Sequence, residues 1–127
     1  MRYLSLVLLI NGVADLMAAF MLIVFPAFGI KVPGHGLFSY ETAFACGGWG
    51  AAAMTFGIAR IWASRNEKYR RYMAYLSLFE GWVLFGFCIL SIILSPVTVI
   101  QALFPLVIGG GMALAYSVAI ISMIRGA

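Results

Sequence analysis

The residues in this sequence best suited to take part in chemistry are two carboxylic acids, Asp15 and Glu80, which lie within long apolar segments. A carboxyl group inside a membrane-spanning helix is energetically costly, so it usually faces protein or water and often binds protons, cations or polar ligands. Neither acid has a cationic neighbour within its own apolar segment. The two acids are therefore the centre of the candidate site.

Other polar residues fall at a similar depth along the chain. At 1.5 Å per residue, Glu80 lies roughly 12 Å inside its expected helix. Asn11, Thr55, and either Tyr116 or Ser117, reach a similar depth in the other three apolar segments. Asp15 follows one turn deeper on the face of Asn11. The sequence thus predicts a polar layer to which every helix contributes.

Three interpretations of this layer are open. Hydrogen bonds between helices could hold the bundle together, with Glu80 either protonated because of its desolvation or paired with Arg60, which would reach down to it. Alternatively, the layer could be a site for a proton, a cation or a small ligand. It could also contact another membrane subunit, which would supply the missing positive charge.

No other pattern in the sequence indicates catalysis or metal binding. His35 is the only histidine and has no second ligand nearby, so we expect a loop residue and no metal site. Cys46 and Cys88 fall in the outer halves of their segments without a Cys-x-x-Cys motif, which favours small buried thiols. No family motif is recognised. We expect a protein without catalytic activity, and an enzyme that uses proton transfer is the alternative.

The composition defines the class of protein that must position these residues. The chain has 127 residues, of which 65% are hydrophobic and only 9% charged. Such a chain is expected to be an integral membrane protein, with room for about four spans of roughly 20 residues each. We predict a single all-α domain over residues 1–127, with transmembrane helices at about 4–25, 41–63, 72–94 and 97–124.

These four helices are expected to form a bundle of two hairpins. The first segment is too long and too polar for a cleaved signal peptide, so we expect it to be retained as a helix. Pro105 is expected to kink the last helix or to mark its true beginning.

Small side chains predict where the helices approach one another most closely. In the second segment they recur every four residues, which places them nearly along one line. Glycines in the last segment offer a similar contact. The residues predicted to pack closely are Ala43, Gly47, Ala51, Thr55, Ala59, Gly109 and Gly110.

The two halves of the chain also share short sequence similarities. Asn11-Gly12 aligns with Glu80-Gly81 at one offset, and Gly47-Gly48 aligns with Gly109-Gly110 at another. The similarities indicate either a parallel internal repeat or chance identity between apolar sequences.

The basic residues predict the orientation in the membrane. They cluster in the segment from Arg60 to Tyr72, which we expect to be a water-exposed connection between the hairpins, and Arg2 and Arg125 belong to the same side. Because cytoplasmic loops are rich in Lys and Arg, both termini are expected to be cytoplasmic, in a plasma (inner) membrane that the chain crosses several times. This role explains the net charge of +4 without a nucleic-acid partner.

Two functional hypotheses follow from these features. The first is an accessory or assembly subunit of a larger membrane complex, or a homo-oligomer, which the small-residue contacts and short loops favour. The alternative is a small transporter or a binder of a proton, ion or lipophilic ligand, centred on Glu80, Asp15, Asn11, Tyr116 and Thr55. The sequence indicates no cofactor, and whether a quinone, pigment or lipid binds is left open.

Overall fold

The computed structural model describes residues 2–31 and 40–126 of the chain. They form four helices and, within these ranges, no strand: α1 (Arg2–Ala27), α2 (Tyr40–Arg65), α3 (Glu67–Leu94) and α4 (Val99–Ile124). The prediction of an all-α fold with four helices is confirmed. His35 lies outside the described residues.

Three of the helices, α1, α3 and α4, are long and apolar enough to cross a membrane. The membrane character of the chain is therefore supported, but α2 is not among the candidate spans. It has the same 26-residue length as α1. Its composition differs because it contains Arg60 and several glycines, which contribute little hydrophobicity.

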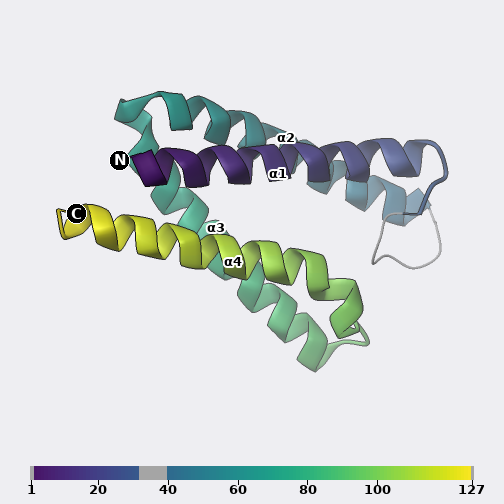
Figure 1. Cartoon of the computed structure of the whole chain (residues 1–127). Coiled ribbons are helices and arrows are strands. Elements are labelled where there is room, and N and C mark those ends of the chain that lie inside the picture. The colour runs from purple at the N-terminus through teal and green to yellow at the C-terminus, as the bar shows by residue number, and fades with distance from the viewer. Residues whose placement is uncertain (1, 32–39, 127) are drawn as a thin grey trace.

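The helices pair as neighbours along the chain. α1 packs mainly against α2, forming the first hairpin, and α3 packs mainly against α4, forming the second hairpin, while contacts between the hairpins are less extensive. Figure 1 shows the N-terminus, the C-terminus and the corner between α2 and α3 at the same end of the molecule. From this corner, α3 diverges from the first hairpin (Figure 1).

The corner between the hairpins is sharp and lies within the basic segment. Asn66 is the only residue between α2 and α3, and its side chain accepts a hydrogen bond from the Lys68 backbone N–H at 3.2 Å. Arg70 Nη2 donates to the Ser64 carbonyl oxygen at 2.9 Å. Asparagine favours this N-cap position, so α3 begins at Glu67, earlier than the sequence suggested.

The start of α4 is also fixed by its cap. Thr98 and Gln101 form a capping box, in which each side chain bonds the other residue's backbone N–H. Pro105 lies inside the helix, so the expectation that it marks the helix start is wrong. Pro105 is the seventh residue of α4, so its missing N–H removes one hydrogen bond within the helix, the bond to the Gln101 carbonyl oxygen.

Glycines allow close approach within both hairpins. A Cβ added to Gly12 would lie 2.8 Å from the Gly57 carbonyl oxygen, and one added to Gly57 would lie 2.9 Å from the Gly12 oxygen. In the second hairpin, a Cβ on Gly81 would lie 3.0 Å from the Gly109 oxygen. The separations in the first hairpin are too short for a real side chain, and that in the second hairpin is tighter than most real contacts, so the helix backbones lie in close contact at these positions.

The two glycine pairs occupy corresponding places in the hairpins. Gly12 faces the backbone of Gly57 and Ile61, and Gly81 faces the backbone of Gly109 and Ala113. The alignment of Asn11-Gly12 with Glu80-Gly81 agrees with this geometry. The alignment of Gly47-Gly48 with Gly109-Gly110 does not, because Gly57 occupies the place that corresponds to Gly109.

The line of small residues predicted on α2 is not its packing face. Ala51 and Thr55 are exposed, and a Cβ on Gly47 would meet nothing within 4 Å. Ala43 and Ala59 are half-buried. The buried face instead contains Cys46, Gly50, Gly57, Arg60 and Ser64. α1 packs on this face because its glycines allow backbone contact, whereas Gly109 and Gly110 on α4 are buried as predicted.

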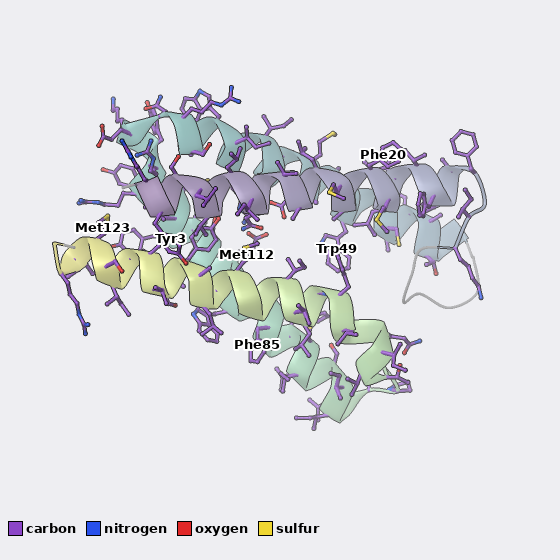
Figure 2. The ribbon with its side chains drawn as sticks, viewed as in Figure 1. Tyr3, Phe20, Trp49, Phe85, Met112 and Met123 are labelled. Carbon is purple, nitrogen blue, oxygen red and sulfur yellow. The ribbon has the colours of Figure 1, made fainter. Side chains whose placement is uncertain are left out.

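The apolar core that joins the hairpins lies near the end of the molecule that holds the corner and both termini. Met112 and Met123 pack against this core. Its buried residues come from all four helices: Leu4, Val7, Leu8, Ala63, Ala74, Tyr116, Ala119 and Ile120. A second cluster, of Leu22, Cys46 and Phe25, lies within the first hairpin. Figure 2 shows Met112 between α4 and the first hairpin, and Phe20 pointing away from the second hairpin.

Candidate functional site

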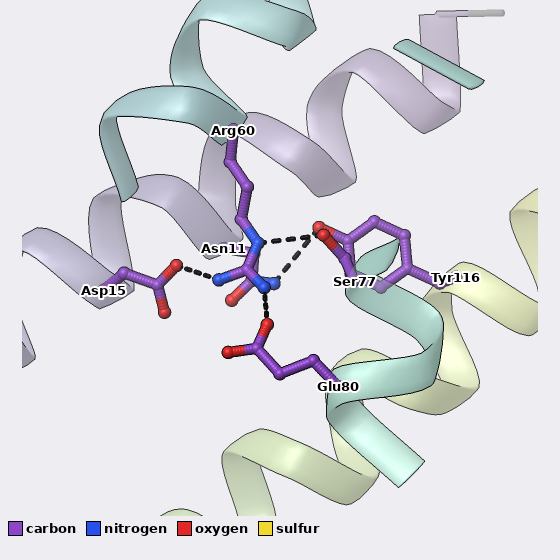
Figure 3. Close-up of polar contacts among 6 residues, drawn as sticks. All are labelled: Asn11, Asp15, Arg60, Ser77, Glu80 and Tyr116. Carbon is purple, nitrogen blue, oxygen red and sulfur yellow. Dashed lines mark hydrogen bonds and ion pairs between the residues drawn. The ribbon is translucent and has the colours of Figure 1, made fainter. Parts of the chain in front are cut away.

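Six residues from all four helices form a polar cluster at the junction of the hairpins (Figure 3). We call this set, listed here by helix, the polar cluster: Asn11 and Asp15 of α1, Arg60 of α2, Ser77 and Glu80 of α3, and Tyr116 of α4. Its members come from distant parts of the sequence, so the cluster exists only in the folded protein.

Arg60 is the centre of the cluster and is almost fully buried, with 2% of its surface exposed. Its Nη1 group donates to Asp15, its Nη2 group donates to Glu80, and its Nε–H donates to the Ser77 hydroxyl at 2.9 Å. A guanidinium group presents its donors in a fixed planar fork, which suits two carboxylates at once. A lysine could not reproduce this arrangement.

The surroundings of Arg60 also favour its charge. The guanidinium carbon lies 5.3 Å from the centre of the Phe56 ring, within the range of a cation–π interaction. Phe56 lies one helical turn before Arg60 on α2, so the ring and the guanidinium group share a face. The helix thus supplies one favourable contact, and the carboxylates of two neighbouring helices supply the others.

The uncharged part of the cluster is a hydrogen-bonded group around Tyr116. Asn11 Nδ2 donates to the Tyr116 hydroxyl at 3.1 Å, and the nearby Ser77 hydroxyl accepts from Arg60 Nε–H at 2.9 Å. Tyr116 is fully buried, and Asn11 and Ser77 are nearly so. Buried polar groups are costly unless paired, so these contacts keep the neutral side of the cluster satisfied.

The two carboxylates differ in exposure. The Asp15 side chain is 15% exposed and the Glu80 side chain 43% exposed. With both acids ionised, two negative charges share the single positive charge of Arg60, so the cluster has a net negative charge. In a low-dielectric environment such an excess charge is unfavourable, and a bound proton or cation would neutralise it.

The structure brings together most of the predicted site residues. Asn11, Asp15, Glu80 and Tyr116 all belong to the polar cluster. Thr55 does not, because it is exposed and donates to the Ala51 carbonyl oxygen of its own helix at 3.0 Å. Every helix contributes a polar side chain to the cluster, but that of α2 is Arg60 and not the predicted Thr55.

Two members of the cluster, Arg60 and Ser77, differ from what the sequence predicted. Arg60 was expected mainly within the exposed connection between the hairpins, and this placement is wrong, because its side chain is buried. The alternative in which it pairs with Glu80 agrees with the contact observed. Ser77 was missed, although it precedes Glu80 by nearly one helical turn and therefore shares its face.

The cysteines are separate from this site. Cys46 packs with Leu22 in the first hairpin, Cys88 is buried on α3, and both thiols are free. Within residues 2–31 and 40–126, no group of three or more His, Cys, Asp or Glu side chains could hold a metal ion.

Comparison with known proteins gives no further guide to the site. No family model, curated protein or solved structure matches the chain. Of the two carboxylates in the polar cluster, Glu80 is the more exposed at the protein surface.

Proposed function

We propose that this chain is a small membrane protein of four spans that binds one proton or one monovalent cation at the polar cluster, with Glu80 as the exchanging group. The proposal depends on one observation: two carboxylates share a single buried guanidinium group, and one of them stays 43% exposed. Transport of the bound ion across the membrane would use this site.

The charge of the cluster supports the proposal. When Asp15 and Glu80 are both ionised, Arg60 compensates only one of them. A single bound proton or monovalent cation makes the cluster neutral, which is the favoured state within a membrane. Glu80 is the group that can exchange this charge, because it is the more exposed of the two acids.

The proposed topology includes α2 as the fourth span. α2 has the length of α1 and packs against it with backbone contact at Gly12 and Gly57. Because α2 packs antiparallel against the apolar helix α1, we propose that the two helices cross the membrane together as a hairpin. Arg2, Arg125 and the basic corner lie at one end of the molecule, which we assign to the cytoplasm of an inner membrane.

The test is proton or cation uptake by the purified protein in lipid nanodiscs. Infrared difference spectra recorded between pH 8 and pH 5 should contain a carboxyl band that Glu80→Gln removes. Thr55→Val is the matched control, because Thr55 is at a similar predicted depth but lies outside the cluster, and it should leave the band unchanged. Titration with Na⁺ or K⁺ at pH 8 then separates cation binding from proton binding. A spectrum that Glu80→Gln does not change would refute the proposal.

A second function is favoured by the exposed face of α2. Gly47, Gly48 and Ala51 are half-buried or exposed, and added Cβ atoms at both glycines would meet nothing within 4 Å. Small residues on a helix surface allow a partner helix to approach closely. The chain would then be an accessory subunit of a larger membrane complex. Extraction in mild detergent tests this, since a monomer without co-purifying membrane proteins would argue against it.

A further inference from the structure

We infer that the two acids of the polar cluster have different tasks, and that the charge on Glu80 holds the two hairpins together. Asp15 is the counter-ion of Arg60 within the first hairpin. Glu80 is its exchangeable partner from the second hairpin, so a proton or cation bound at Glu80 releases the second hairpin from the first. This inference rests on the proposed function and describes how binding at that site changes the structure.

The polar contacts between the hairpins support this division. Asp15 and Arg60 belong to the same hairpin, whereas Glu80 and Ser77 belong to the other. The bond from Asn11 to Tyr116 also crosses between the hairpins. Of these crossing contacts, the one between Arg60 and Glu80 joins two opposite charges, so it is the one that a proton on a carboxylate weakens most.

The charged and titratable groups around Glu80 come from the other three helices. Arg60 of α2 pairs with Glu80, Asp15 of α1 shares the same guanidinium group, and Tyr116 of α4 completes the cluster. Loss of the Glu80 charge leaves Arg60 paired with Asp15. Because a buried charge without a partner is very costly, this remaining pair makes the released state accessible.

The distribution of apolar contacts supports movement of the hairpins as two bodies. The core that joins all four helices lies near the corner at Asn66. Further from the corner, the buried cluster of Leu22 and Cys46 belongs to the first hairpin alone. Backbone contacts at the glycine pairs keep each hairpin together. Separation at the end far from the corner would therefore break few apolar contacts.

The expected effect follows from the kind of hydrogen bond that is weakened. A bond between two charged groups is roughly twice as strong as a neutral bond. Replacement of the charged bond by a neutral one should shift the ratio of closed to open molecules about tenfold.

The experiment measures distances between spin labels on the full chain in lipid nanodiscs, at pH 8 and pH 5. In a background with Cys46→Ser and Cys88→Ser, Phe44→Cys and Ile100→Cys place one label on each hairpin at exposed positions. We expect a longer or broader distance distribution at pH 5, and the same change at both pH values with Glu80→Gln. A control pair within the first hairpin, Phe28→Cys with Phe44→Cys, should not change, which shows that the variant is folded.

Asp15→Asn separates the two tasks. With Asp15 neutral, Arg60 has only Glu80 as a charged partner, so the hairpins should stay closed at pH 8 and open less at pH 5. Distances that do not respond to pH or to Glu80→Gln would overturn the inference. If the carboxyl band of Glu80 still responds to pH in that case, the proposed binding function stands and only the coupling to hairpin movement fails.

Discussion

Removal of the central cation should destabilise the protein in a way that depends on pH. Arg60→Met leaves Asp15 and Glu80 without their counter-ion. Loss of one partner of a buried ion pair typically costs about 3–5 kcal/mol. The Glu80 share is smaller because its side chain is 43% exposed. We therefore expect a loss of about 3 kcal/mol in the free energy of unfolding at pH 8. The loss should be smaller at pH 5, because protons then neutralise the two acids.

The assay is reversible unfolding in mild detergent, followed by the helical circular dichroism signal at both pH values. The control variant carries Asp15→Asn, Arg60→Met and Glu80→Gln together, and it should recover most of the lost stability. Uncharged residues of similar size often replace a buried charge cluster without loss. The reasoning is wrong if Arg60→Met is as stable as the parent at pH 8, or if the triple variant is no more stable than the single one.

Three further predictions test the packing, the neutral hydrogen bonds and the orientation. Gly12→Ala should cost about 1–3 kcal/mol in the same unfolding assay, because its Cβ would lie 2.8 Å from the Gly57 oxygen, whereas Gly47→Ala should cost nothing. Tyr116→Phe should cost about 1–2 kcal/mol by leaving the buried Asn11 amide unpaired, and adding Asn11→Leu should restore part of that loss. In whole cells, a membrane-impermeant thiol reagent should not label Lys68→Cys, but it should label Lys31→Cys; the opposite pattern would reverse the orientation.

Much of the candidate site was predictable because buried polar residues are rare in apolar helices. Depth along each helix alone grouped Asn11 with Glu80 and Tyr116, and the structure brings these residues into one cluster. Depth does not specify which way a residue faces. Thr55 therefore satisfied the depth criterion, yet it bonds its own helix on the exposed side.

The packing face of α2 could not be predicted from its small residues alone. Glycine and alanine occur all around this helix, so more than one line of small side chains can be drawn along it. The face that packs is set by α1, whose Gly12 meets Gly57, and the same face carries Arg60 into the polar cluster. The face of α2 that packs is therefore set by its backbone contact with α1, and not by the four-residue repeat of small side chains.

α2 is the one of the four described helices that is not a candidate span, and it supplies the buried arginine at the centre of the polar cluster. An arginine at the centre of a spanning helix costs about 2.5–3.5 kcal/mol on insertion scales. Arg60 lies nearer the end of α2, but its side chain is buried, and the glycines of this helix add little hydrophobicity to offset the cost. Asp15 of α1 and Glu80 of α3 supply the carboxylate partners that offset the cost of burying the Arg60 charge. The glycines of α2 allow α1 to come close enough to provide the first of these partners. The features that remove α2 from the candidate spans are thus the ones that build the polar cluster.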